Sequence, residues 1–146
     1  MKHSRRVRGA NLEPCDFLSR TKQFIHLKDG HESAPISHLW NQGLVSAEAF
    51  VRDADYRGHL RNAVKKRQKK ANKEGFDTLL PTRRNRPAPA EYSVVFGIMR
   101  SRYARKGTLG LPFFSKVSLR SVAARIDSMG YPVQVHLIEK RREDKP

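Results

Sequence analysis

The tightest constraint on the fold comes from two short apolar segments, residues 12–18 and 23–28, joined by the polar link Ser19-Arg20-Thr21-Lys22. Both segments are short for helices, and the link has the length of a hairpin connection, so we expect two neighbouring antiparallel strands. Neighbouring strands bring together side chains that are distant in sequence. Asp16 and Lys28, twelve positions apart, are therefore expected side by side at adjacent strand ends.

Helical spacing follows this hairpin. Pro35 suits the first turn of a helix, because its missing N–H would have no partner there in any case. The apolar residues with helical spacing are Ile36, Leu39, Trp40 and Leu44. We expect Gly43 to break or bend this helix, with a further short helical turn over residues 45–51. Asp53 has the chemistry of an N-cap for a second helix that reaches about residue 72 and is ended by Gly75.

The second half of the chain alternates strand, helix and strand. The near-continuous apolar run over residues 92–99 is typical of a central strand, and apolar residues alternate over 133–138 as in a closing strand. Between these strands, Ser115 or Ser118 can cap a third helix, and the Phe113-Phe114 pair before it is expected to anchor in the core. The expected buried positions of this helix are Val117, Leu119, Val122, Ile126 and Met129.

These elements predict an α/β (α+β) domain in the order β-β-α-α-β-α-β, with a mixed sheet of about four strands and about three to four helices. Residues 1–11 are expected to form a basic flexible lead-in, 12–138 a single domain with an exposed Pro- and Arg-rich loop over 80–90, and 139–146 a charged tail. Because the domain begins directly with a hairpin, we expect preceding elements to be missing.

The charge of the chain points to a polyanionic partner. Lys and Arg number 30 against 14 Asp and Glu, which gives a formal net charge of +16. Such an excess attracts nucleic acid, DNA or RNA, with an affinity that falls steeply as salt rises. An anionic membrane surface is the second candidate, and a missing acidic neighbour is the alternative explanation. The expected phosphate contacts are Arg61, Lys65, Lys66, Arg67, Lys69, Lys70, Lys73, Arg83, Arg84 and Arg86.

Cysteine usage and hydropathy narrow the class of protein further. Cys15 is the single cysteine, so the chain has neither an intramolecular disulfide nor a cysteine-based zinc site. No apolar run approaches the ~20 residues that a membrane-spanning helix needs, and the basic N-terminus lacks the apolar core of a signal peptide. We therefore expect a cytoplasmic protein.

Four segments together resemble one bacterial family. They are Glu13-Pro14-Cys15-Asp16, residues 24–28, residues 37–48 and residues 111–120. They are similar to the C-terminal part of a sporadically distributed family of unknown function whose members are considerably longer. The resemblance implies a missing N-terminal half or partner subunit, and the patchy distribution suggests a phage-defence or mobile-element system.

A more distant resemblance implies chemistry. The PD-(D/E)xK nuclease core has an acid on one strand, a second acid two residues before a lysine on the next strand, and in some branches a polar residue on the following helix. The segment from Asp16 to Gln42 is similar to this core. Carried over, Asp16 would bind Mg²⁺ or Mn²⁺, Lys28 would steady the developing charge, and Gln42 would be the polar residue on the helix. His26 stands where that pattern has its second acid, so His26 itself, or Glu13 or Glu48, would have to complete the metal site.

Four other interpretations stay open. Asp16 and Lys28 can form a simple cross-strand ion pair. His26-Leu27-Lys28 can begin a phospholipase-D-like motif with a histidine nucleophile, although Ser33 stands where that motif has Asp. The domain can also be a non-catalytic nucleic-acid-binding or interaction module, the remnant or separated half of a longer protein, or a toxin acting on a protein target.

Overall fold

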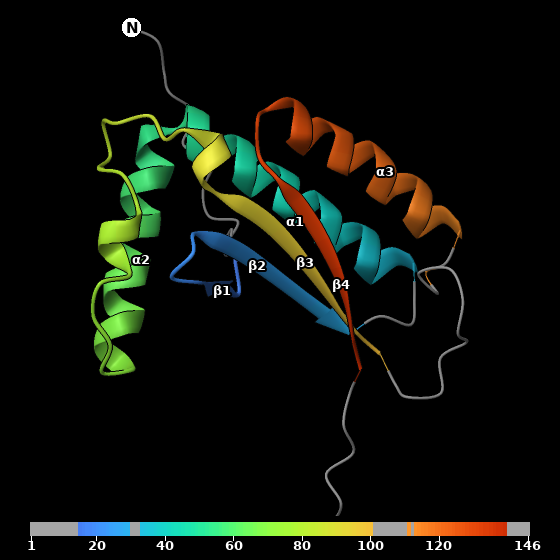
Figure 1. Ribbon diagram of the computed structural model, residues 1–146, viewed down its shortest axis with the longest axis horizontal. Coiled ribbons are helices and arrows are strands. Elements are labelled where there is room, and N and C mark those ends of the chain that lie inside the picture. The colour runs from blue at the N-terminus through green and yellow to red at the C-terminus, as the bar shows by residue number, and fades with distance from the viewer. Residues whose placement is uncertain (1–14, 30–32, 101–110, 112, 140–146) are drawn as a thin grey trace, which may run out of the picture.

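The computed structural model describes residues 15–29, 33–100, 111 and 113–139 (Figure 1). Its elements confirm the mixed α+β class and the predicted order. They are the strands β1 (Phe17–Leu18), β2 (Gln23–Asp29), β3 (Ser93–Arg100) and β4 (Val133–Glu139), the helices α1 (Ser33–Arg52), α2 (Ala54–Lys70) and α3 (Phe113–Ser128), and the 3-10 turns η1 (Asp77–Leu79) and η2 (Pro89–Glu91).

The four strands form one sheet in the order β1-β2-β3-β4. β1 pairs antiparallel with β2, as expected for the hairpin, whereas β2, β3 and β4 run parallel. Parallel neighbours need crossover connections, which α1 with α2 supplies between β2 and β3, and α3 between β3 and β4. α1 and α3 lie side by side across one face of the sheet, and α2 stands beyond the end of that layer next to the hairpin (Figure 1).

The main core lies between the sheet and α1. Side chains on a strand alternate between its faces, so every second residue of β2 and β3 points toward the helices. Phe24, Val94, Phe96 and Ile98 are buried there, and Phe96 packs edge-on against Trp40 of α1 with ring centroids 4.8 Å apart. The buried apolar side chains on the helix-covered face therefore extend from β2 to β3.

Gly43 does not break the first helix, so that prediction is wrong. α1 runs without interruption from Ser33 to Arg52, through Gly43 and the predicted separate turn at 45–51. A Cβ atom on Gly43 would lie only 2.4 Å from Cε1 of the buried Phe96 ring. The absence of a side chain at Gly43 therefore allows the helix to approach β3 closely. Hydrophobic periodicity alone does not predict this contact.

The third helix begins earlier than predicted. α3 starts at Phe113, so Ser115 and Ser118 lie inside it and do not cap it. Phe113 and Phe114 are about three-quarters exposed and do not anchor in the core, and Val117 is also exposed. Ser115 is buried in place of Val117, with its carbonyl oxygen accepting a hydrogen bond from Nε1 of Trp40 at 3.1 Å. The buried stripe of α3 is Ser115, Leu119, Val122 and Ile126.

α2 is capped as the sequence predicts. The Asp53 carboxylate accepts hydrogen bonds from the backbone N–H groups of Asp55 at 2.9 Å and Tyr56 at 3.2 Å. The helix ends at Lys70, slightly before the predicted limit, and Asn72 has a left-handed backbone with φ of 55° ahead of Gly75 at 84°. In the described part of the chain, no helix is long and apolar enough to cross a membrane.

The Gly43 contact gives a stability prediction. Gly43→Ala should destabilise the fold by roughly 1–2 kcal/mol, because the clash with Phe96 costs more than the better helix propensity of alanine returns. Gly58→Ala is the matched control in α2, where the nearest atom to an added Cβ is Cδ of the flexible Arg83 side chain at 3.3 Å.

Urea denaturation of the two variants measures the difference. Gly58→Ala should be neutral or stabilising by up to about 1 kcal/mol. Equal stability changes for both substitutions would show that Gly43 has no special packing role.

Candidate functional site

Asp16 lies at the edge of the sheet, just before β1. Its backbone N–H donates to the carbonyl of Ile25 at 2.9 Å, and its Oδ2 accepts from the backbone N–H of Leu27 at 2.6 Å. Leu27 stands between His26 and Lys28 in β2, so the carboxylate is held beside the segment that carries both predicted partners. The carboxylate already has a structural task, because it continues the hydrogen bonding of β1 along the edge of β2.

His26 and Lys28 share a face of β2, as their spacing predicts, but their surroundings differ. Lys28 is exposed near the end of the strand, whereas His26 is only 4% exposed and lies beneath α1. Burial lowers the pKa of His26 to about 4 from its ordinary value of 6.5, and the nearby charge of Asp16 opposes that shift only in part. The imidazole is therefore neutral near pH 7.

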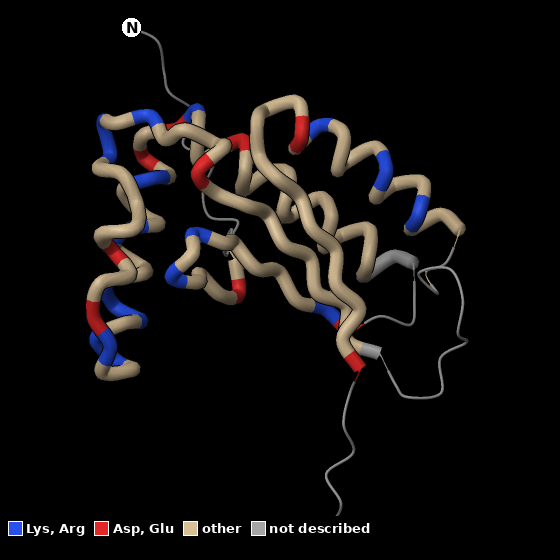
Figure 2. The backbone as a smooth tube through the Cα atoms, in the orientation of Figure 1, with Lys and Arg blue, Asp and Glu red and all other residues tan. Residues whose placement is uncertain are grey.

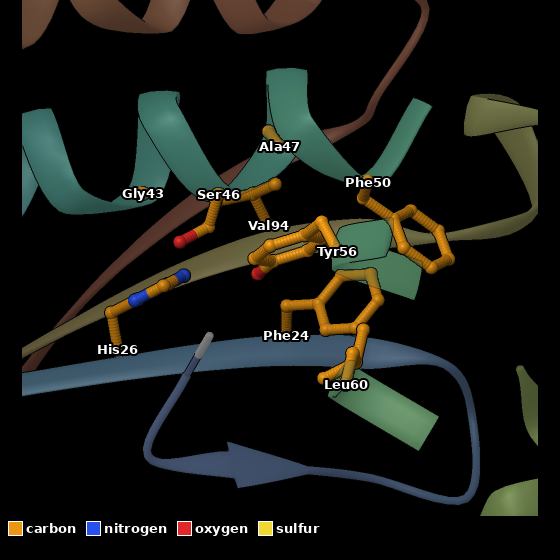
Figure 3. A pocket seen from close by; sticks show the side chains of 9 residues that line it. All are labelled: Phe24, His26, Gly43, Ser46, Ala47, Phe50, Tyr56, Leu60 and Val94. Atoms are coloured by element: carbon orange, nitrogen blue, oxygen red, sulfur yellow. The ribbon is translucent and has the colours of Figure 1, made fainter. Parts of the chain in front are cut away.

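The His26 ring borders a small cavity between β2, α1 and α2 (Figure 3). The cavity measures about 10 Å³, close to the minimum that holds one water molecule. Ser46 and Tyr56 reach the same space from the two helices, and burial raises the pKa of the Tyr56 phenol. The Ser46 hydroxyl is buried, and its interaction with the Tyr56 phenol opposes part of that rise in pKa. Sequence reasoning missed Ser46 and Tyr56, because each occupies an ordinary position in a helix.

The remaining members of the predicted metal site are not assembled within the described residues. Gln42 is half-buried on α1, and Glu13 lies outside the described residues. No group of three or more His, Cys, Asp or Glu side chains in residues 15–29, 33–100, 111 and 113–139 is placed to hold a metal ion. Binding of Mg²⁺ or Mn²⁺ at Asp16, with Lys28 and Gln42 in supporting roles, stays a prediction.

The predicted phosphate contacts gather on α2 and on the loop that follows it (Figure 2). Arg61 is half-buried, and all the other members of the set are exposed: Lys65, Lys66, Arg67, Lys69, Lys70, Lys73, Arg83, Arg84 and Arg86. Residues three and four positions apart share a side of a helix. We call the exposed side that carries Lys66, Lys69 and Lys70 the outer side of α2. Lys69 lies opposite the buried Leu60, and Lys66 and Lys70 lie between Lys69 and Ala63 around the helix.

The loop after α2 returns along the helix and divides the basic residues into two groups. Asp77 of this loop lies near the middle of α2, where a hydrogen bond from Gln68 and the charges of Lys65 and Arg61 lower the pKa of its carboxyl. Arg83 forms an ion pair with Asp55 at the other end. The C-terminal half of α2 therefore carries lysines that form no ion pair within the described residues.

Comparison with known proteins identifies a family. The model of a family described as "Family of unknown function (DUF6119)" matches residues 1–139. No curated protein and no solved structure matches the chain.

The buried histidine makes the stability of the fold dependent on pH. In the unfolded chain His26 takes up a proton as pH falls through 6.5, but in the folded chain it stays neutral down to about 4. Stability from this residue is thus complete above pH 6.5 and is lost as pH falls toward 4, by roughly 3 kcal/mol in total.

Urea denaturation across this pH range, compared between the wild type and His26→Leu, isolates the effect. The variant should show a shallower loss of stability, while His38→Gln, which alters an exposed histidine, should follow the wild type. Parallel curves for the wild type and His26→Leu would contradict the assignment.

Proposed function

The chain belongs to the family of unknown function DUF6119, so membership of the family indicates no activity. From the residues of the chain itself, we propose that it binds nucleic acid through the outer side of α2. The single observation that carries the proposal is the run from Arg61 to Lys73, which holds seven Lys or Arg residues and no acid. A helix face that needs only to be solvated generally intersperses charges of both signs.

The exposed charges of this face are not neutralised within the described part of the protein. No ion pair there involves Lys66, Lys69 or Lys70. Like charges one helical turn apart repel one another and destabilise the helix slightly. A polyanion removes that repulsion and releases its own condensed counterions on binding, so the association is favourable at low salt.

Nucleic acid explains this surface better than a lipid bilayer does. A helix that binds a membrane surface buries an apolar side in the headgroup region while its cations face anionic lipid. The apolar side of α2 faces the rest of the protein, with Leu60 buried and Val64 packed against the core. The outer side offers only polar and charged groups, which suits phosphates that stay in water.

The mode of binding is contact with the phosphate backbone. Lysine side chains are flexible point charges that bind phosphate without fixing the identity of a base. We therefore propose a binding module with little sequence preference and a strong salt dependence, in which binding at α2 does not require cleavage at the hairpin.

Reversing charge on α2 tests the proposal. Lys66→Glu/Lys70→Glu should weaken binding of a labelled oligonucleotide about tenfold or more in about 50 mM salt and reduce the slope of affinity against salt. Arg120→Glu/Arg125→Glu, on the exposed side of α3, is the matched control because it changes the net charge equally.

Fluorescence anisotropy over about 50 to about 200 mM salt measures both quantities. The control should lose only the small amount that reflects the lower overall charge. Equal losses in the two variants would mean that α2 is not the binding surface, and undiminished affinity in both would remove the proposal.

A further inference from the structure

A groove of about 330 Å³ lies between β1 and α2. Residues at the start of the hairpin form one wall, and the side of α2 that turns away from solvent forms the other. Figure 1 shows the two elements standing next to each other at the end of the molecule that α1 and α3 leave uncovered. The groove is much larger than the cavity beside His26 and can hold a group of the size of an aromatic heterocycle.

Mostly apolar residues line the groove, and two phenylalanines are among them. Leu60, Ala63 and Val64 of α2 line it on one side, and Phe17 of β1 lines it on the other. Phe17 pairs with Ile25, on the face of the sheet opposite Phe24, and it is 59% exposed at the edge of the groove. Phe76, in the loop after α2, is the second ring.

Contacts between the hairpin turn and the loop after α2 hold Phe76 in place. The guanidinium of Arg20 lies over the Phe76 ring, 4.4 Å from its centroid. The same guanidinium donates a hydrogen bond to the carbonyl of Glu74 at 3.2 Å. Arg20 therefore positions the ring and places a positive charge near this end of the groove.

Positive charge surrounds the groove. Arg67 and Lys73 line it directly, and helical spacing puts Lys66 and Lys70 on the same side of α2 as Ala63. Lys66 and Lys70 are four residues, about 6 Å, apart along the helix axis. Asp16 is the acidic residue among the lining side chains, and its Oδ2 is occupied by the N–H of Leu27. The groove is complementary to a ligand with a flat apolar body and several anionic groups.

We propose that the groove receives an unpaired base of single-stranded DNA or RNA, while the flanking phosphates lie on Arg67, Lys73 and the Lys66–Lys70 side of α2. This inference rests on the proposed function and adds the substrate class to it. Bases in a duplex are stacked and paired, so they cannot enter. A single strand exposes its base faces, which stack on aromatic side chains without regard to sequence. A long-chain carboxylate would fill the apolar space but would use only one of the cations.

Binding of a labelled single strand and of a duplex of equal length tests the inference. The wild type should prefer the single strand by at least about fivefold, and Phe17→Ala should remove most of that preference while duplex binding stays unchanged. Ala63→Leu, which adds bulk inside the groove, should have the same effect. Phe113→Ala, which removes a more exposed ring from α3, should leave the preference intact.

A 2-aminopurine base within the single strand reports stacking directly. Its emission should change on binding to the wild type and change less on binding to Phe17→Ala. The inference is overturned if single strand and duplex bind equally, or if Phe17→Ala and Ala63→Leu behave as the wild type. It is also overturned if sodium laurate displaces the strand and the 2-aminopurine emission does not change when the strand binds. Should Lys66→Glu/Lys70→Glu still weaken binding in any of these cases, the proposed function stands without the groove. Failure of that variant as well would remove both.

Discussion

The position of α2 depends on one buried guanidinium. Arg57 is only 4% exposed, and it donates hydrogen bonds to the carbonyl oxygens of Phe50 and Val51 at the end of α1 and of Arg83 in the loop after α2. Helix-terminal carbonyls have no partner within their own helix, so this side chain satisfies groups that would otherwise be buried unpaired. It joins α1, α2 and the returning loop at one point. The basic side of α2 and the groove beside β1 both depend on that junction, because α2 itself buries little apolar surface.

The order of elements could be predicted because each carries a local signal. Alternating or continuous apolar runs indicate the strands, and Asp53 marks the start of α2 with a cap that the structure confirms. The errors fall where tertiary contacts override local signals. Gly43 resembles a helix breaker until the proximity of Phe96 is known. Phe113 and Phe114 look like core residues, but they are exposed, and Ser115 is buried against α1, where its backbone carbonyl accepts a hydrogen bond from Trp40.

The candidate sites also combine features that have a local signal in the sequence with features that depend on tertiary contacts. The structure places the Asp16 carboxylate at the backbone N–H of Leu27, between His26 and Lys28, and a pattern of side chains cannot show that hydrogen bond. Sequence reasoning identified the basic residues of α2 by composition. It could not find the groove, because the two walls are separated by about forty residues and neither Phe17 nor Phe76 has an aromatic neighbour in sequence. Surfaces assembled from separate elements become visible only when the fold brings them together.

The location of bound nucleic acid can be measured residue by residue with amide ¹H–¹⁵N NMR spectra during titration with a short single-stranded oligonucleotide. The largest shifts should fall in α2 from Arg61 to its C-terminal end, in Lys73 and in β1, with small changes in α3 and β4. Shifts concentrated on α3 or β4, or an unchanged spectrum at saturating oligonucleotide in low salt, would contradict binding at α2.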